Sequence, residues 1–287
     1  MVITALARAK INLTLDVLGK RPDGYHEVEM VMQSIELHDR LEFRPCAAGG
    51  ISLAVEGADL PPGKENLVYR AAELLRAAGG VRAGAEIRLK KAIPVAAGLG
   101  GGSADAAAAL VALNEMWNTG FSPAGLMELA EQLGSDVPFG LMGGTALARG
   151  RGERLERLFP CPPLGLVLVK PPFGVSTAEV YRAFKPGLNP KKADAQAMVR
   201  AIKKGDAADI AACLGNALEP VTVKMYPEVA EIKKKLMEAG ALGALMAGSG
   251  PTVFGLTADL ESARQVAARY RRTDEQILVT RTFNPRL

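Results

Sequence analysis

The sequence is poor in cysteine, histidine and aromatic residues, and each shortage excludes a class of protein. Its three cysteines (Cys46, Cys161 and Cys213) are far apart and form no C-x-x-C pair, so we expect a reducing, cytoplasmic setting rather than a disulfide scaffold. The two histidines, His26 and His38, are too few for a dedicated zinc site. A serine hydrolase is not indicated either, because no G-x-S-x-G motif is present to expose a nucleophilic serine.

Long apolar runs and concentrated charge are also missing. Apolar runs such as residues 164–169 are far too short to cross a bilayer, and the N-terminal residues lack the apolar core of a signal peptide. The net charge is only +4, and the basic residues are dispersed. A nucleic-acid groove needs a basic stripe with stacking aromatics, but aromatic residues make up only 5% of the chain. We therefore expect an anionic small molecule as the partner, with neither nucleic acid nor a membrane.

The composition and length are those of a folded globular protein with one large or two ordinary domains. Hydrophobic residues make up 48% of the 287 residues and charged residues 23%, which is typical of a soluble globular protein. The proline-rich stretch 160–163 interrupts the pattern and predicts a boundary between an N-terminal domain, 1–160, and a C-terminal domain, 161–287. Helix and strand patterns follow one another without strict βα alternation, which favours the α+β class.

Hydrophobic periodicity and turn residues predict the elements. Residues 7–17 alternate between apolar and polar side chains, as in a half-buried strand, and Pro22-Asp23-Gly24 predicts a turn before the next strand. Further strands are expected at residues 25–35, 41–44, 51–55, 85–93, 145–148, 152–158, 166–170, 242–247, 253–257 and 276–282. Helices are expected at residues 66–78, 103–117, 123–133 and 260–272, and near Ser176, Asp194, Asp206 and Pro227.

The most informative feature is a glycine-rich loop at residues 94–104, followed by the alanine-rich run 106–109. Four glycines within five residues leave the backbone bare, so its N–H groups can approach a ligand closely. Ser103 is predicted as the N-cap of a helix, whose N-terminus attracts anions. The loop lacks the lysine of a Walker A motif and the third glycine of a dinucleotide fingerprint. We interpret it as a phosphate cradle, and an ordinary glycine turn before a core helix is the alternative.

A second glycine cluster lies at residues 246–252, between two expected strands. It fits a tight hairpin connection. It also fits a second bare loop that packs against the first, so that phosphates lie between the two. The sequence leaves both interpretations open.

Two charged residues are candidates for catalysis. Asp136 follows a helix and precedes Pro138, so it either caps the next short helix or accepts a proton from a substrate hydroxyl. Lys10, on the polar face of the first strand, is either a solvated lysine or a cation that keeps a nearby carboxylate ionised and offsets charge on a transferring group. Sequence spacing does not show that the two residues meet.

Five motifs together resemble the GHMP small-molecule kinases, in the order in which that family carries them. They are Lys10-Ile11-Asn12, Pro22-Asp23-Gly24-Tyr25-His26, the glycine loop, Gly134-Ser135-Asp136-Val137-Pro138 and Ala247-Gly248-Ser249-Gly250-Pro251-Thr252. The glycine loop alone identifies only the superfamily. The second and fourth motifs point to the members that act on 4-diphosphocytidyl-2-C-methyl-D-erythritol. The resemblance implies a two-domain α+β GHMP kinase fold, with ATP and the substrate in the interdomain cleft.

The resemblance also implies roles for individual residues. Lys10 and Asp136 match the catalytic pair, and Asn66 begins the segment beside the adenine. The ATP phosphate loop is matched by Pro94, Val95, Ala96, Ala97, Gly98, Leu99, Gly100, Gly101, Gly102, Ser103 and Ala104. The substrate contacts are matched by Asn12, Tyr25, His26, Arg151, Thr177 and Tyr181. His26 is expected to read the cytosine edge through its ring nitrogens. Met32 stands where some members carry phenylalanine, a departure that puts a two-sided aromatic sandwich there in question.

The implied reaction is ATP-dependent phosphorylation of the 2-hydroxyl group of that substrate, in the non-mevalonate route to isoprenoid precursors. ATP is the implied cofactor, with Mg²⁺ bridging its β- and γ-phosphates. Alternatives are a GHMP kinase that acts on homoserine or a mevalonate-type alcohol, and a nucleotide-binding sensor without turnover. The presence of both Lys10 and Asp136 argues against the sensor.

Overall fold

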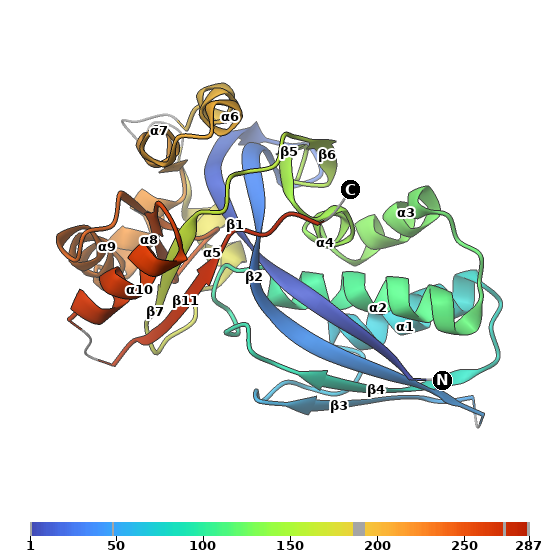
Figure 1. Cartoon of the computed structure of the whole chain (residues 1–287). Helices are drawn as coiled ribbons and strands as arrows, with labels where there is room; N and C mark the ends of the chain where they lie inside the picture. The colour runs from blue at the N-terminus through green and yellow to red at the C-terminus, as the bar shows by residue number, and fades with distance from the viewer. Residues whose placement is uncertain (1, 48, 186–192, 272–273, 286–287) are drawn as a thin grey trace. The chain divides into compact units, whose positions relative to one another are not determined.

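The computed structural model describes residues 2–47, 49–185, 193–271 and 274–285 (Figure 1). These residues form two compact units that interleave along the chain. Unit 1 comprises Met1–Ala9, Leu37–Ile93 and Gly100–Met142, and unit 2 comprises Lys10–Glu36, Pro94–Leu99 and Gly143–Leu287. Helices and strands occur in both units, which confirms the α+β class. The predicted domain boundary at residue 160 stays a prediction.

Two long strands contribute to both units. They are β1 (Ile3–Lys20) and β2 (His26–Cys46), which are neighbours in one sheet. The sequence predicted two separate strands where β2 is one, because no glycine or proline at residues 36–40 introduces a turn. A half-buried strand was also wrong for the middle of β1. Lys10, Asn12 and Thr14 are 8%, 0% and 0% exposed, so the polar face is buried as well.

Unit 1 combines part of this sheet with four helices. β4 (Gly84–Lys90) pairs antiparallel with residues 40–46 of β2 and parallel with β3 (Ile51–Glu56). The helices are α1 (Leu67–Ala78), α2 (Gly101–Trp117), α3 (Pro123–Leu133) and α4 (Val137–Met142). Figure 1 shows α1 and α2 running along one side of the strands.

The core of unit 1 depends on the alanine run of α2. Ala106, Ala107 and Ala109 are fully buried together with apolar side chains of β2, β4 and α1. Their short side chains allow close helix packing. α2 and α4 approach so closely that a Cβ atom added to Gly140 of α4 would lie only 2.7 Å from Ala107 Cβ. The glycine loop therefore leads into a helix that is held firmly on several sides.

Unit 2 contains an antiparallel four-stranded sheet in the order β11-β7-β10-β9. Its strands are β7 (Gly165–Lys170), β9 (Gly243–Met246), β10 (Val253–Thr257) and β11 (Gln276–Arg281). The hairpin of β5 (Thr145–Arg149) and β6 (Arg154–Arg157) pairs with β2, and the short strand β8 (Gly215–Asn216) pairs parallel with β1. The helices are α5 (Thr177–Ala183), α6 (Ala195–Lys204), α7 (Ala207–Ala212), α8 (Glu219–Met225), α9 (Glu228–Glu238) and α10 (Leu260–Arg269).

Several of the described helices begin with a side chain that caps them. Side chains accept backbone N–H groups at the starts of α1, α3, α5, α6, α7 and α10, from Asn66, Ser122, Ser176, Asp194, Asp206 and Asp259. The prediction of Ser103 as a cap is wrong. α2 begins two residues earlier, at Gly101, because Gly100 adopts the left-handed conformation (φ 70°) that turns the chain into the helix.

Two short elements, β8 and α8, were not predicted, since two residues and seven residues carry too little periodicity to detect. Among the described residues, no helix combines the length and the apolarity that a membrane crossing requires.

Candidate functional site

The glycine-rich loop connects β4 to α2 and has an unusual backbone. Gly98 (φ 76°) and Gly100 (φ 70°) are left-handed, and so is Ala96 (φ 50°). In α2, the N–H group of Ala104 is the donor to the Gly100 carbonyl, at 2.9 Å. The N–H groups of residues 101–103 precede this first intrahelical bond, so the end of the helix offers them to an anion. The side chains of Ala97 and Leu99 are buried, which anchors the loop, while Val95 is 43% exposed.

The second glycine cluster packs directly against this loop in unit 2. It connects β9 to β10 as a hairpin, in which Ala247 N donates to Thr252 O and Gly250 N to Ala247 O, both at 2.8 Å. A Cβ atom added to Gly98 would lie 2.1 Å from the Ala247 carbonyl oxygen, so the two backbones touch where Gly98 has no side chain. The hairpin and the packing of the two loops are therefore both confirmed, while phosphates between the loops stay a prediction.

Lys10 lies beside the junction of the two loops. Its backbone N–H group donates to the Leu99 carbonyl at 3.0 Å, which ties β1 to the first loop. A Cβ atom added to Gly248 would lie 3.6 Å from Lys10 Nζ, so the ammonium group is close to the second loop as well. Lys10 Nζ donates to Asn12 Oδ1 at 2.9 Å. The solvated-lysine interpretation is wrong, because Lys10 is 8% exposed and makes defined contacts.

Asn12 is fully buried behind Lys10. Its Oδ1 atom accepts from the Lys10 ammonium group, and its Nδ2 atom lies 2.9 Å from Met30 Sδ. These contacts orient Lys10, so Asn12 can act on a ligand through that lysine. A direct contact of Asn12 with the substrate stays a prediction.

Asp136 belongs to unit 1, where it directly precedes α4. Its backbone carbonyl accepts from Gly140 N at 3.2 Å, and its side chain is partly buried. Because Lys10 belongs to unit 2, the pairing of these two residues stays a prediction.

Asn66 and Ser103 occupy defined places in unit 1. Asn66 caps α1, with Oδ1 accepting from Val68 N at 3.0 Å and Nδ2 donating to the Pro61 carbonyl at 3.1 Å. Ser103 lies in the first turn of α2 and is partly buried. Beside the start of α1, unit 1 has an open pocket of about 410 Å³, lined by Lys64, Tyr69, Arg70, Glu73, Leu74, Gln132 and Leu133.

Aromatic rings gather around His26 in unit 2. The His26 and Tyr181 ring centroids are 5.2 Å apart, and the Phe184 ring meets His26 edge-on at 6.3 Å. Burial, with a smaller effect of Lys20, lowers the pKa of His26, so its ring is neutral at pH 7 and has one donor and one acceptor nitrogen. Phe184 was not singled out in the sequence, although it stands three residues after Tyr181, a spacing that places side chains on one face of a helix.

Thr177 and Tyr25 are two further predicted substrate residues, and both belong to unit 2. Thr177 opens α5, and its hydroxyl group is 2.8 Å from the hydroxyl of Ser249 in the second glycine loop. Tyr25 is 55% exposed, and the guanidinium carbon of Arg151 lies 5.0 Å from its ring centroid. Met32 is fully buried in β2, opposite Ala146 of β5, and lies in the core.

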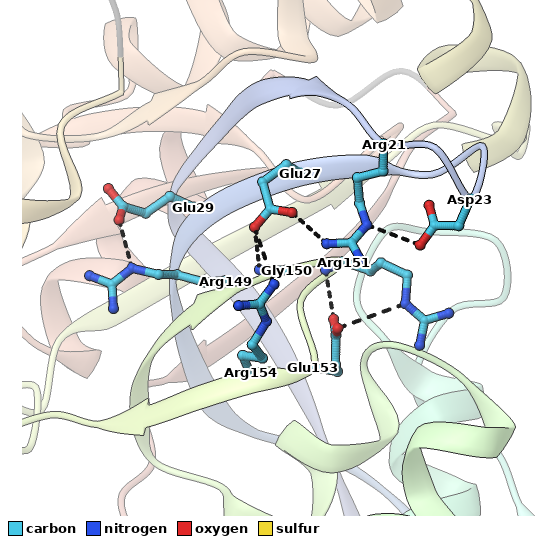
Figure 2. A network of polar contacts seen from close by, with 9 residues as sticks. All are labelled: Arg21, Asp23, Glu27, Glu29, Arg149, Gly150, Arg151, Glu153 and Arg154. Atoms are coloured by element: carbon cyan, nitrogen blue, oxygen red, sulfur yellow. Dashed lines mark hydrogen bonds and ion pairs between the residues drawn. The ribbon is translucent and has the colours of Figure 1, made fainter.

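Ion pairs lie beside the turns that carry Tyr25 and Arg151, and Figure 2 shows those of Arg21, Glu27 and Arg151. Glu27 Oε2 accepts from the Arg21 guanidinium, and Glu27 Oε1 accepts from Gly150 N at 3.2 Å. Arg151 N donates to Glu153 Oε2 at 2.6 Å. We refer to Arg21, Asp23, Glu27, Glu29, Arg149, Arg151, Glu153 and Arg154 as the Glu27 network.

A buried ion cluster, not predicted from the sequence, lies at the two stems of the glycine loop. Lys91, just after β4, donates to Asp39 of β2 and, at 2.8 Å, to Asp105 Oδ2 of α2. Asp39 Oδ1 also accepts from the N–H groups of Ala92 and Ile93. Burial raises the pKa of Asp105 to about 7, and Asp39 adds to the rise, while Lys91 opposes it. The available signal was a lone aspartate inside the alanine run.

No metal centre is built from side chains alone in the part of the chain that the structure describes, where no cluster of three His, Cys, Asp or Glu residues is placed to hold an ion. Any divalent cation at the loops would therefore take most of its ligands from a phosphate and from water.

Both halves of the chain match GHMP kinase families. Residues 66–144 match the GHMP kinases N terminal domain, and residues 198–276 match the family described as GHMP kinases C terminal. The 4-diphosphocytidyl-2-C-methyl-D-erythritol kinase of Moorella thermoacetica is 54% identical over 98% of this chain and 99% of its own length. The enzyme of the same name from Bacillus subtilis is 49% identical over 89% of this chain and 88% of its own length.

Solved structures agree with these matches. A crystal structure of 4-(cytidine 5'-diphospho)-2C-methyl-D-erythritol kinase is 37% identical, with a TM-score of 0.84 over 99% of this chain and all of the other. Homoserine kinase from Cytophaga hutchinsonii has a TM-score of 0.77 over 97% of this chain and 94% of its own. At 21% identity, that second likeness shows the shared fold alone.

Proposed function

Because the chain belongs to the GHMP kinases and, among them, to the 4-diphosphocytidyl-2-C-methyl-D-erythritol kinases, we propose that it transfers the γ-phosphoryl group of ATP to the 2-hydroxyl group of 4-diphosphocytidyl-2-C-methyl-D-erythritol. The observation that carries this proposal is that the two glycine loops pack against each other, with the ammonium group of Lys10 beside their junction. Bare backbone next to a buried cation is suited to a polyphosphate.

ATP binding rests on the loop and on the start of α2. The N–H groups at residues 101–103 and the bare backbone of residues 94–100 hold the β- and γ-phosphates, and the helix end contributes a favourable dipole. Leu67 and Val68, which follow Asn66, lie beside the adenine. Both polar atoms of the Asn66 amide are already hydrogen-bonded within the protein. Asn66 therefore supports Leu67 and Val68 by capping α1.

Lys10 and Asp136 carry out the transfer. Asp136 accepts the proton of the substrate's 2-hydroxyl group while the oxygen of that hydroxyl group bonds to the γ-phosphorus. At the same time, the bond between the γ-phosphorus and the β–γ bridging oxygen breaks, and ADP is released. Lys10 offsets the negative charge on the group in transit, because Asn12 and the Leu99 carbonyl fix its position. Alignment and charge account for most of the rate enhancement in this chemistry.

Mg²⁺ fits the oxygen donor at the start of α2. A divalent ion held mainly by phosphate oxygens needs only one or two protein oxygens, and the partly buried hydroxyl group of Ser103 is available in the first turn of α2. When bound, the ion neutralises charge on the β- and γ-phosphates. Asp105 is not a ligand in this proposal, since Lys91 engages it.

The cytidine end of the substrate binds in unit 2. The neutral ring of His26 presents a donor and an acceptor to the cytosine edge, and Tyr181 holds that ring in place. Tyr25 offers its exposed ring for stacking on the base. Arg151 and Thr177 contribute polar groups toward the diphosphate and the sugar alcohol. The chain's three free thiols support a cytoplasmic setting, and no nucleic-acid partner is proposed.

The test is a coupled kinase assay with ATP and the diphosphocytidyl substrate, with the product identified by mass spectrometry. We expect a product heavier by one phosphoryl group. If the protein phosphorylates homoserine or mevalonate but not this substrate, the proposed acceptor is wrong. ATP binding without turnover of any of these alcohols would indicate a sensor.

The role of Asp136 is tested separately. Asp136→Ala should lower kcat by roughly 10²- to 10⁴-fold, the range for a general base. Asp209→Ala, which removes an exposed carboxylate paired with Lys204, is the matched control. An unchanged kcat in folded Asp136→Ala protein would exclude the proposed role.

A further inference from the structure

One carboxylate, that of Glu27, joins two turns in unit 2. The first is the turn between β1 and β2, in which Arg21 N donates to Tyr25 O at 2.8 Å and Tyr25 N donates to Asp23 Oδ1 at 3.1 Å. This turn presents Tyr25 and leads directly into His26. Its shape therefore determines where the two rings stand.

The second turn joins β5 to β6 and presents Arg151. Gly150 (φ 75°) and Gly152 (φ 115°) give it a backbone that other residues rarely adopt, and Arg151 N donates to Glu153 Oε2 at 2.6 Å. One backbone bond joins this turn to β2, from Val28 N to Gly150 O, at 2.8 Å. That bond joins β2 to the second turn but involves no residue of the first turn.

The side chain of Glu27 connects the two turns (Figure 2). Its Oε2 atom accepts from the guanidinium group of Arg21, at the base of the first turn. Its Oε1 atom accepts from Gly150 N at 3.2 Å and lies 3.7 Å from the guanidinium group of Arg154, both at the second turn. Charge-assisted bonds of this kind are stronger than neutral ones, so both turns are held through one side chain.

Across the two turns, Tyr25 lies against Arg151. The guanidinium carbon lies 5.0 Å from the ring centroid, within the range of a cation–π contact. The ring is still 55% exposed, so it keeps surface on which a flat ligand can stack. An exposed tyrosine without such a support would sample several rotamers and would lose that freedom on binding.

We propose that Glu27 is a positioning residue that selects the nucleobase-bearing substrate, by holding the Tyr25–Arg151 pair in a geometry ready for stacking. Glu27 does not touch the substrate itself. The inference rests on the proposed function, because Tyr25 and His26 must face the cytidine end for Glu27 to matter.

The expected effect of Glu27→Gln is confined to that end of the site. The amide keeps an acceptor for Gly150 N but loses the charge that holds Arg21 and Arg154. We expect KM for the diphosphocytidyl substrate to rise about fivefold, with kcat and KM for ATP within twofold of the wild type. The inhibition constant of cytidine diphosphate, a fragment without the sugar alcohol, should rise by a similar factor.

Glu156→Gln is the matched control. Glu156 is also a carboxylate on this hairpin, but it is 65% exposed and pairs only weakly with Arg149, at 3.5 Å. All kinetic constants should match the wild type in this variant. A thermal melt of each variant shows whether the fold is retained.

A double-mutant cycle separates positioning from general support of the fold. If Glu27 acts through Tyr25, Glu27→Gln should change KM little in a Tyr25→Ala background, so the two effects should not add. Additive effects, or equal losses in kcat and both KM values, would overturn the inference. If wild-type protein phosphorylates the substrate but Glu27→Gln has an unchanged KM, only the role of Glu27 is wrong. If wild-type protein does not use the substrate, the proposed function is wrong.

Discussion

Two clusters of charged side chains, one in each unit, lie in opposite surroundings. In unit 1, the side chains of Lys91, Asp39 and Asp105 are at most 4% exposed. In unit 2, the side chains of the Glu27 network range from 12% to 65% exposed. The buried cluster places one cation between two carboxylates, while the exposed one spreads its charges over a surface.

The difference indicates two uses of charge. Ions that leave water lose their hydration, so a buried cluster is held together strongly and fails when one member is removed. Exposed pairs keep much of their hydration and contribute little to stability, yet they orient side chains toward a ligand. We therefore expect variants of the unit 1 cluster to change unfolding, and variants of the unit 2 network to change binding.

The largest expected effect is that of Lys91→Met. This change leaves Asp39 and Asp105 buried without their cation, which should lower the free energy of unfolding by about 3–5 kcal/mol. Urea unfolding at pH 7, followed by circular dichroism, measures the change. Lys204→Met is the control, since it breaks the exposed pair with Asp209 and should cost less than about 1 kcal/mol. Equal losses in the two variants would remove the contrast between buried and exposed charge.

The next effect concerns Asp105 and pH. Burial raises its pKa to about 7, from an ordinary value of 3.8, and the nearby Asp39 adds to the rise, while Lys91 offsets part of it. Between these two values the folded state binds a proton that the unfolded state has lost, so this group makes stability fall as pH rises from 4 to 7. Asp105→Asn removes the contribution. Relative to wild type, the variant should gain about 1–3 kcal/mol between pH 5 and pH 8, measured by urea unfolding at both pH values. A constant difference across that range would contradict the raised pKa.

How far the sequence predicts such features depends on how local their cause is. The glycine loop, the strand β1 and the helices α1 and α3 are set by neighbours in sequence, and each was predicted. The long strand β2 was divided in two because its middle carries charged residues. The N-cap at Ser103 was misplaced because Gly100 already turns the chain.

The parts that were missed depend on contacts distant in sequence. Lys91 meets Asp39 across 52 residues and Asp105 across 14, and no spacing rule links such positions. The burial of Asn12 behind Lys10 follows likewise from the surroundings of β1 rather than from its own pattern. For the candidate site, the sequence was enough to match residues to a family. Which residues lie beside them in space could be learned only from the fold.

A smaller effect, on binding alone, is expected for His26→Ala in unit 2. The loss of the hydrogen bonds to the base and of the Tyr181 contact should raise KM for the cytidine substrate about tenfold, equivalent to about 1.4 kcal/mol. KM for ATP should stay unchanged, and steady-state kinetics with each substrate varied in turn measures both. An equal rise in the two KM values would show that His26 supports the fold rather than the base. Since burial lowers the pKa of His26, the wild-type KM should not change between pH 7 and pH 8.

The smallest effect is expected for Glu156→Gln, at the outer edge of the unit 2 hairpin. Arg149 has a closer partner in Glu29, at 2.9 Å, so losing Glu156 at 3.5 Å leaves its guanidinium engaged. The free energy of unfolding should change by less than about 0.5 kcal/mol, as judged by urea unfolding at low and high salt. A larger loss that disappears at high salt would mean that the exposed charges stabilise unit 2 collectively. The distinction between a stabilising buried cluster and an orienting exposed network would then have to be abandoned.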